Sequence, residues 1–479
     1  MNKKIYMGMR LRRLRAQRGM SQSALAQALE LSPSYVNQIE QNQRPISANV
    51  LLRLQALGVD VRQFSGDEEA GLAAALQEAL ADAPEAVTWP ELQEVAEQMP
   101  AFAGAVLALH RRNVQLTQEL EALTQCLDDR RGGGHGGGAQ VLPHAAPYEE
   151  VRDFFFAHQN YFDSLDRAAE ELAQELGAHG AALVPELEQR LHASHSVHVE
   201  RIDGSVPPDK RRYDPDARRL TLSARLSPGQ QAFQMGTQLA LLEFSRHIDE
   251  LVSAPELADA QAKRLARIGL ANYAAGALLL PYGAFQSTAE GMRHDIERLG
   301  QYFGVGFETI CHRLSTMQRP GAPGVPFFFV RVDRAGNISK RQSATHFHFS
   351  RTGGACPLWN VYEAFEQRGR ILVQLAGMPD GRRYLWIARS VTHGHPGWGQ
   401  PRQQFSIGLG CDVRHAHRLV YARGLDLKDP AAATPIGMGC RVCERSGCTQ
   451  RAFPFAARLL RVDENTSAFA PYGDVGEGR

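Results

Sequence analysis

The sequence lacks any run of about 18 consecutive apolar residues, which argues against a membrane-spanning helix. Its first residues carry two lysines but no apolar stretch behind them, so we expect no signal peptide and a cytoplasmic location. Cysteine is scarce: there are seven in 479 residues, an odd number that does not suit a disulfide framework. With 43% hydrophobic and 22% charged residues, the composition is globular and excludes a disordered or fibrous chain.

Acidic residues are rare at the start of the chain and abundant directly after it. Residues 1–66 contain ten Lys and Arg against three Asp and Glu, a net charge of +7. Residues 67–131 contain thirteen acidic residues against four Arg, a net charge of −9. A basic segment followed by an acidic one indicates a polyanionic partner for the first segment alone.

The basic segment has the pattern of a helix-turn-helix domain. Ser21 is placed to cap one helix, and Ser32 with Pro33 begins the next, whose Val36 and Ile39 would face inward. In such a motif the second helix lies in the major groove, where its early polar residues meet base edges and nearby polar residues hold phosphates. The candidate DNA-binding residues are Gln22, Ser32, Ser34, Tyr35, Asn37, Gln38, Asn42 and Arg44.

Residues 6–65 resemble the phage-repressor-like (XRE, Cro/repressor) helix-turn-helix family. The resemblance implies binding to double-stranded operator DNA, usually at paired half-sites by a dimer. One departure is Glu30 in the turn, where such domains often have Gly; a positive φ is uncommon but tolerated at a residue with a side chain. The residues that carry the resemblance are Ser21, Gln22, Ala26, Ser32, Pro33, Ser34, Tyr35, Val36, Gln38, Ile39 and Glu40.

Residues 67–131 are expected to form a helical linker that contains a dimerisation coiled coil. Its seam residues recur at alternating spacings of four and three, and one buried Asn in an a position favours a single register. A helix packed on its own domain is the alternative. The Gly-rich residues 132–146 predict a flexible linker. The seam consists of Phe102, Val106, Leu109, Asn113, Leu116, Leu120, Leu123 and Leu127.

Residues 147–290 are predicted to be an α+β domain. Its order is a helix over about 148–176, a strand at 196–202, a hairpin within 211–222 and two further helices at about 228–247 and 258–279. This order resembles the ImmA/IrrE family of zinc peptidases, in which a His-Glu-x-x-His helix binds the metal.

The residues of that zinc motif are absent here. Thr237, Gln238 and Leu241 occupy the aligned positions, and Leu270 stands where a third, acidic ligand is expected. The resemblance therefore implies a degenerate ImmA/IrrE-like domain that is not an enzyme, with a pocket that is free to take a small effector.

Residues 291–479 predict a C-terminal α+β domain of sensor type, with strands at 326–332, 371–375, 384–391 and 404–409. The fold class expected for the whole chain is therefore multidomain α+β: an all-α helix-turn-helix head, a helical linker, the degenerate ImmA/IrrE-like domain and this sensor-type domain.

Three cysteines of the C-terminal domain, Cys440, Cys443 and Cys448, lie within nine residues and can converge on one soft metal centre. Cys411 is the candidate fourth ligand and Cys356 its competitor. Four thiolates suit either a [4Fe–4S] cluster or structural zinc. Because zinc sites more often have two Cys-x-x-Cys pairs, the single pair favours the cluster; zinc and no metal stay as alternatives.

The whole chain is similar to XRE regulators that have an ImmA/IrrE-like middle and a ScfR-type (short-chain fatty acid regulator) C-terminal domain. The resemblance implies a transcriptional regulator of propionate or acetate metabolism that senses a short-chain acyl-CoA and holds a [4Fe–4S] cluster. It rests on the segments 353–360, 378–381 and 410–412 and on Cys440, Cys443, Glu444, Arg445, Cys448, Arg451, Ala452, Phe453 and Pro454.

A CoA ester needs cations for its phosphates, an aromatic ring for its adenine and an apolar slot for its acyl group. The effector-binding candidates that could supply these groups are Tyr161, Arg201, Lys210, Arg211, Arg212 and Tyr273. For each of them, ordinary surface charge or core packing is an equally good explanation.

We expect the protein to be a homodimer or a higher oligomer. The alternatives to an acyl-CoA-sensing regulator are a redox- or iron-sensing regulator without CoA and a metallopeptidase of the ImmA/IrrE type.

Overall fold

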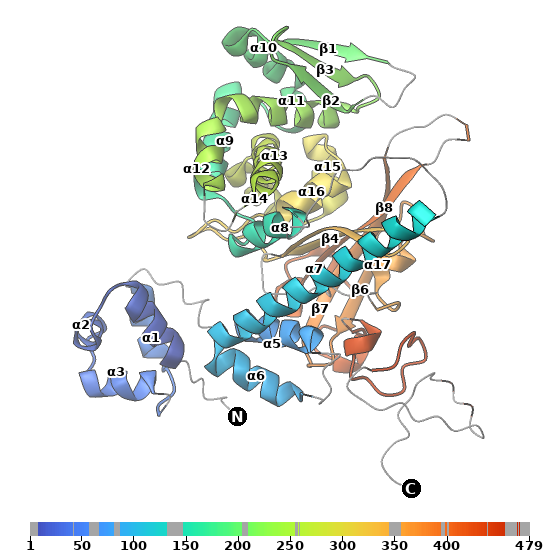
Figure 1. Cartoon of the computed structure of the whole chain (residues 1–479). Helices are drawn as coiled ribbons and strands as arrows, with labels where there is room; N and C mark the ends of the chain where they lie inside the picture. The colour runs from blue at the N-terminus through green and yellow to red at the C-terminus, as the bar shows by residue number, and fades with distance from the viewer. Residues whose placement is uncertain are drawn as a thin grey trace. The chain divides into compact units, whose positions relative to one another are not determined.

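The computed structural model confirms the multidomain α+β class (Figure 1). The chain divides into two compact units, the first within residues 1–113 and the second within residues 114–455. The structure describes residues 8–41, 43–56, 67–80, 87–131, 147–203, 209–253, 257, 259–343, 356–393, 398–399, 402–437, 439–455, 467 and 469.

The N-terminal helices of the first unit are α1 (Gly8–Gln17), α2 (Gln22–Ala28), α3 (Pro33–Glu40) and α4 (Ala48–Ala56). Their apolar faces share one core, in which Leu11, Leu29 and Leu54 are fully buried. This core is small, so hydrogen-bonded caps matter for its helices. Ser21 and Ser32 cap α2 and α3, and such caps stabilise a helix by about 1 kcal/mol each.

A second helical cluster follows in the acidic segment. It consists of α5 (Asp67–Ala79), α6 (Trp89–Gln98) and the start of α7 (Pro100–Arg131). Leu76, Leu92 and Ala103 form its centre. Thr88 and Glu91 form a capping box at the start of α6, which satisfies backbone donors that a free helix end would leave unpaired.

The second unit begins with α8 (Pro147–Ala157), α9 (Asp163–Leu176) and α10 (Val184–His195), with η2 (Gly180–Leu183) between the last two. The sequence predicts one helix over 148–176, and the structure corrects this prediction. Gln159 and Asn160 have φ of 52° and 57°, a left-handed conformation that ends α8. The side chain of buried Asn160 donates a hydrogen bond to the carbonyl of Ser343 (2.8 Å), which stabilises the break.

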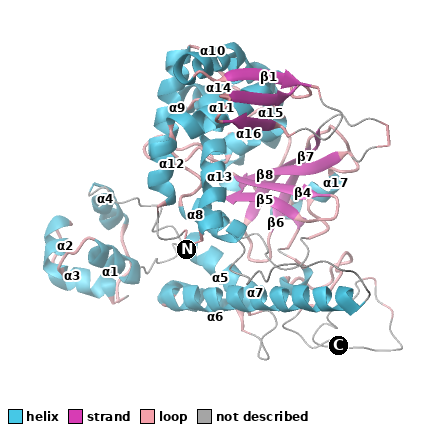
Figure 2. Cartoon of the chain, turned by 45° about the horizontal axis from the view of Figure 1, so that its top comes forward, coloured by secondary structure: helices cyan, strands magenta, loops and turns pink. Residues whose placement is uncertain are grey.

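The smaller sheet has the order β1-β3-β2, from β1 (His198–Ile202), β2 (Arg211–Asp214) and β3 (Arg219–Ser223). β1 runs parallel to β3 and β2 runs antiparallel to it, which confirms the predicted hairpin. Beside this sheet lie α10 and α11 (Pro228–Glu243), as Figure 2 shows.

The remaining helices of the second unit are α12 (Ser245–Val252), α13 (Ala260–Leu279), α14 (Tyr282–Gly291), α15 (Ile296–Phe303) and α16 (Phe307–Leu314). The central helix is α13, which packs on α11, α8 and α9. The C-terminal half of α13, from Leu270 to Leu279, is almost entirely buried. Gly236 of α11 lies against Ala275 of α13, where small residues on both helices meet.

The larger sheet has the order β5-β4-β8-β7-β6-β9 and is antiparallel except for the β6–β9 pair. Its strands are β4 (Phe328–Asp333), β5 (Ile338–Ser343), β6 (Leu372–Gly377), β7 (Arg383–His393), β8 (Gln403–Asp412) and the short β9 (Thr434–Pro435).

Each face of this sheet is covered by a different core. Leu385, Ile387, Leu409 and Cys411 join the helical core of α8–α16, so the helices and the sheet are packed as one body. Phe328 and Trp386 face the other side, where they meet α17 (Asn360–Glu363) and the residues near it. Successive side chains of a strand point to opposite faces of the sheet, so neighbouring residues of one strand belong to different cores.

A buried ionic network joins the helices of the second unit. Asp166 of α9 is fully buried and accepts hydrogen bonds from Arg313 (2.7 Å) and Arg319 (2.9 Å). The hydroxyl of Tyr273 also donates to it (2.7 Å), and Glu170 pairs with Arg319 (2.7 Å). Each buried charge of this network therefore has a partner of opposite charge.

Within the described residues, no single helix is long and apolar enough to cross a membrane; α13 and α14 together meet that criterion by length and composition but are bent by 61° at their junction.

Candidate functional site

The exposed surface of α2 and α3 is the candidate nucleic-acid interface. Ser32 accepts a hydrogen bond from the backbone N–H of Tyr35 (3.2 Å) and lies 3.1 Å from the hydroxyl of Ser34. Glu30 in the turn has φ of 51°, as expected from the missing Gly. Arg53 donates to the carbonyls of Leu29 and Glu30 (2.7 Å each) and thereby holds this turn.

A polar cluster of Arg15, Gln22, Asn37 and Glu40 links α1, α2 and α3. Glu40 is buried and pairs with Arg15 of α1 at 2.7 Å. Gln22 donates to Glu40 (2.9 Å) and to Asn37 (3.2 Å). The hydrogen bond that Arg15 donates to Glu40 raises the pKa of the Arg15 guanidinium. Gln22 and Asn37 thus bridge the two helices on the side that would face DNA.

The candidate DNA-binding residues lie together on this surface. Ser32, Ser34, Asn37 and Arg44 are exposed, and Gln22, Tyr35 and Gln38 are half-buried. The guanidinium of Arg44 stands 5.5 Å from the centre of the Tyr35 ring. Asn42 lies outside the described residues.

The predicted seam of α7 is exposed at three of its positions. Phe102, Leu109 and Leu116 are 56%, 69% and 53% exposed. Val106 instead packs partly against the cluster of α5 and α6. One face of α7 therefore contacts its own unit, while the neighbouring apolar face is uncovered. Dimerisation stays a prediction, and the side chains of Leu120, Leu123 and Leu127 lie outside the described residues.

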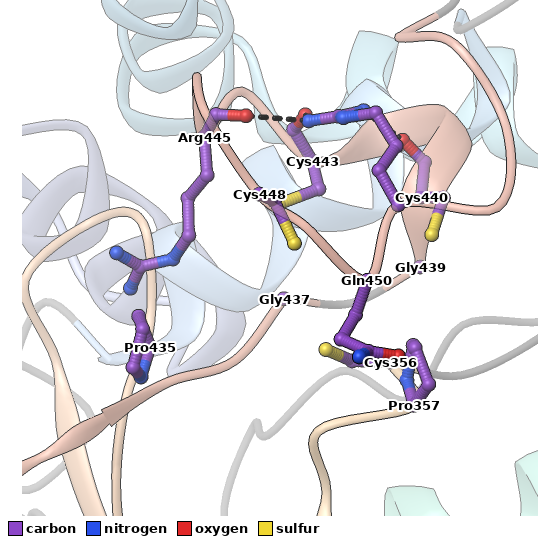
Figure 3. A pocket seen from close by; sticks show the side chains of 11 residues that line it. Cys356, Pro357, Pro435, Gly437, Gly439, Cys440, Cys443, Arg445, Cys448 and Gln450 are labelled. Atoms are coloured by element: carbon purple, nitrogen blue, oxygen red, sulfur yellow. Dashed lines mark hydrogen bonds between the residues drawn. The ribbon is translucent and has the colours of Figure 1, made fainter. Parts of the chain in front are cut away.

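Four cysteines line one hollow next to β9, at the edge of the larger sheet. Cys356, Cys440, Cys443 and Cys448 line it, with Arg445 and Arg451 (Figure 3). Cys440 belongs to η5 (Cys440–Val442), and Cys356 stands just before α17. Gly437 allows the backbone to pass close to the side chain of Cys443, because an added Cβ at Gly437 would be 2.7 Å from the Sγ of Cys443.

Backbone N–H groups point at several of these sulfur atoms. The N–H of Ala452 donates to the Sγ of Cys440 (3.3 Å). Burial raises the pKa of Cys356 and Cys443, and hydrogen bonds from backbone N–H groups oppose this shift in both. Such donors favour thiolates, the form that binds metal.

Cys411, the residue expected as the fourth ligand, does not line this hollow. It is fully buried on β8 and belongs to the core shared with α8–α16. Cys356 and Trp386 belong to the core on the opposite face of the sheet. Because the register places Cys411 on the helical face, the sheet separates it from the other three thiols, and burial raises its pKa. Cys356, the competitor, takes its place in the hollow.

The spacing of the thiols bears on the kind of metal. In the part of the chain that the structure describes, no three Cys, His, Asp or Glu side chains are arranged to hold a single metal ion. The cysteines surround the hollow without converging on one point. Sequence reasoning favoured Cys411 over Cys356, whereas Cys356 is the one that lines the hollow. The choice depends on the tertiary structure, which places Cys411 on the helical face of the sheet.

The effector candidates differ in how available they are. Tyr273 is 3% exposed and bonded to Asp166, and Tyr161 is 8% exposed and bonded to Asp163 and Arg319. Neither ring is free to stack on an adenine, which corrects that expectation. The tyrosines are used inside the ionic network instead.

The basic candidates lie on or beside the smaller sheet. Arg201 is engaged by Glu188 (2.8 Å) and Gln231 (2.9 Å), and exposed Arg212 lies 3.7 Å from Asp209. Lys210 is exposed. Among the described residues, half-buried Arg211 donates a single long hydrogen bond, of 3.4 Å, to the carbonyl of Gln234, and burial lowers its pKa.

The helices expected to carry the peptidase motif meet through small, apolar and uncharged polar residues. Thr237 of α11 donates to the carbonyl of Phe233 (2.8 Å) and contacts Asn272 of α13 (3.3 Å). Leu270 is fully buried. Glu243 is the one acidic residue of α11, and it pairs with Arg190 and His195 (2.9 Å each).

Three family models match separate segments of the chain. A family model of a helix-turn-helix domain matches residues 7–64, and a model of the IrrE N-terminal-like domain matches residues 193–315. A model of the short-chain fatty acyl coenzyme A regulator, C-terminal, matches residues 316–472.

Full-length relatives are similarly clear. The HTH-type transcriptional regulators RamB and PrpR of Mycobacterium tuberculosis are 51% and 47% identical, over 98% of this chain and 98% and 96% of theirs. The propionyl-CoA carboxylase regulator of Cereibacter sphaeroides is 44% identical over 98% of this chain and 99% of its own.

A solved structure of a Mycobacterium tuberculosis transcriptional regulator is 50% identical, covers 69% of this chain and all of its own, and has a TM-score of 0.67. The chain therefore belongs to the family of HTH-type transcriptional regulators that carry the short-chain fatty acyl coenzyme A regulator C-terminal domain.

Proposed function

We propose that this protein binds operator DNA as a homodimer, responds to a short-chain acyl-CoA derived from propionate or acetate, and holds a [4Fe–4S] cluster. The observation that carries the proposal is the four-cysteine hollow, which lies in the domain matched by the short-chain fatty acyl coenzyme A regulator model. The exposed helix-turn-helix surface supplies the DNA-binding part.

The candidate DNA-binding residues fall into two groups, those placed to contact bases and those placed to contact phosphates. Ser34, Asn37 and Gln38, at the exposed side of α3, would contact base edges. Gln22 and Arg44 would hold phosphates on either side. The buried Glu40 pair fixes the angle at which α3 enters the groove.

At the hollow, Cys356, Cys440, Cys443 and Cys448 would hold the cluster. Their donor set fits the group, because all four are sulfur ligands and backbone N–H groups point at several of them. Thiols that surround a hollow suit a cluster, which brings its own iron and sulfide atoms, better than a single zinc ion. When bound, the cluster supplies one-electron redox chemistry and sensitivity to iron supply.

For the effector, Arg211 is the best-supported phosphate ligand among the candidates. It is half-buried and, within the part of the chain that the structure describes, donates to one backbone carbonyl and to no carboxylate, so an incoming phosphate would compensate its charge. Lys210 and Arg212 add positive charge beside it. A peptidase function is disfavoured, because α11 and α13 offer no His and no free carboxylate where they meet.

The experiment is DNA binding by anaerobically purified full-length protein, with iron and acid-labile sulfide measured on the same sample. Propionyl-CoA, acetyl-CoA and free CoA are added in turn. The proposal expects bound iron and sulfide and an operator affinity that an acyl-CoA changes at least fivefold. Effector and DNA that bind independently contradict the regulatory link. A response to iron removal but to no CoA ester supports the redox-sensing alternative.

A further inference from the structure

Two arginines of the cysteine hollow have no carboxylate partner among the described residues. Arg451 is 7% exposed and donates to the carbonyls of Cys440 (2.9 Å), Cys443 (2.9 Å), Arg445 (2.5 Å) and Phe453 (3.4 Å). Half-buried Arg445 donates to the carbonyls of Gly377 (2.6 Å) and Ile436 (3.2 Å).

A buried guanidinium that meets only neutral carbonyls is satisfied in hydrogen bonds but not in charge. The other fully buried arginine in the described part of the chain is paired: Arg313 lies 2.7 Å from Asp166. The mostly buried Arg319 contacts both Asp166 and Glu170. Removing a cation from water without a counter-charge costs several kcal/mol, on the order of the effective penalty for one ion. The hollow therefore has an excess of positive charge that calls for an anion.

Neutral thiols do not supply that anion, but a metal–thiolate centre does. Four thiolates outweigh the positive charge of a [4Fe–4S] core or of Zn²⁺, so either centre is a net anion. Arg445 and Arg451 line the same hollow as all four cysteines. Arg451 also contacts the carbonyls of two of the four cysteines, which places its charge beside their chain segment.

We infer that Arg445 and Arg451 are the counter-charges of an anionic metal–thiolate centre, and that Arg451 tunes it as a positioning residue. The inference rests on the proposed cluster. The guanidinium of Arg451 fixes the carbonyls of Cys440 and Cys443, so it orients their thiols. Arg445 ties the same segment to the end of β6 through Gly377, so the centre and the edge of the larger sheet are mechanically joined.

The test compares charge variants of the full-length protein, purified without oxygen. Arg451→Gln removes the charge and keeps a polar side chain, and Arg451→Lys keeps the charge and loses the planar fork. Arg441→Gln is the matched control, because Arg441 lies in the same segment, on η5, but is exposed. The readouts are iron and sulfide per chain and the midpoint potential from a dithionite titration followed by absorbance.

Reduction adds negative charge to the centre, so a nearby cation favours the reduced form. Arg451→Gln is expected to shift the equilibrium at least tenfold toward the oxidised form, about 59 mV more negative for one electron. Arg451→Lys is expected to stay near the wild-type potential, and Arg441→Gln to leave it unchanged.

Equal potentials and iron contents in wild type and Arg451→Gln overturn the inference, as does an equal shift in Arg441→Gln. If Arg451→Gln binds no iron, recovery by Arg451→Lys supports the charge, whereas a folded Arg451→Lys protein without iron overturns it. Wild-type protein without iron and sulfide refutes the proposed cluster instead. If that protein holds zinc, the same variants are compared by the rate of zinc transfer to a chelator, which Arg451→Gln is expected to raise at least tenfold.

Discussion

Single residues decide which thiols of this protein can meet. Cys356 and Cys411 are both buried, yet they lie in the cores on opposite faces of one sheet. Neighbouring residues of a strand alternate between the two faces of the sheet. A cysteine on the helical face could therefore reach the hollow only if its strand were paired in a register shifted by one residue.

This difference predicts opposite results for two alanine variants. Cys356→Ala is expected to lose the cluster, since it removes one of four ligands. Cys411→Ala is expected to keep the wild-type iron content and to lose about 1 kcal/mol of unfolding free energy from a small cavity. Iron analysis and urea unfolding of both proteins check this. Iron retained in Cys356→Ala and lost in Cys411→Ala would restore Cys411 as the ligand.

A second residue-scale prediction concerns acid stability. Burial raises the pKa of Glu308, but the hydrogen bond from His393 (2.9 Å) and the charges of Arg331, His393 and Lys340 outweigh it and lower the pKa to about 2. The unfolded state, with a pKa near 4.5, therefore takes up the proton first. The stabilisation is complete above pH 4.5 and is lost as the pH falls toward 2.

Glu308→Gln should remove this pH-dependent part, on the order of 3 kcal/mol at neutral pH. Urea unfolding of wild type and variant between pH 7 and pH 3 measures it, and the two free energies should approach each other as the pH falls. Glu366→Gln, at an exposed position, is the control. A stability gap that is the same at both ends of this range contradicts the prediction.

At the scale of elements, helix α7 has two apolar faces, of which one is packed and the other is exposed. Ala103 and Leu107 pack on α5 and α6, whereas Phe102, Leu109 and Leu116 are exposed. A second α7 would cover the exposed face with the heptad spacing that coiled coils use.

The substitution Leu109→Asp is therefore expected to convert a dimer into a monomer, because it places a charge in the centre of the seam. Ala108→Asp introduces the same charge at an exposed position beside the seam and should leave the dimer intact. Sedimentation equilibrium gives the mass, and circular dichroism verifies that both variants keep their helices. Equal masses for the two variants would show that this face is not the dimer interface.

At the scale of the whole molecule, the helices of α8–α16 and the larger sheet share one core. The ionic network of Asp166, Arg313 and Arg319 is buried within the same unit. Helices and sheet should therefore unfold together, although they match two different family models.

Arg313→Met tests this cooperativity. It removes one partner of a fully buried carboxylate and should cost about 3–5 kcal/mol. The double variant Asp166→Asn with Arg313→Met should lose less than the sum of the single changes, since the unpaired charge is gone. Hydrogen exchange of the backbone amides of α13 and of β7 should report one shared, shifted unfolding transition. Different unfolding transitions for α13 and β7 in the wild type would contradict the shared core.

Local patterns in the sequence were sufficient for the helix-turn-helix, the hairpins, the Cys440–Cys448 cluster and the family. These features depend on residues close in sequence: caps such as Ser32, the alternation of strands and short spacings between cysteines. The left-handed break at Asn160 was missed, because its stabilising contact is with Ser343, far along the chain.

What only the tertiary structure decided is which distant groups share a space. Sheet register separates Cys411 from the hollow, and the chain before α17 brings Cys356 to it. The packing of the helices buries Tyr161 and Tyr273 in an ionic network that leaves no free ring. The unpaired charges of Arg445 and Arg451 are visible only once their neighbours are known. Side chains distant in sequence become neighbours through packing, and no local pattern encodes that proximity.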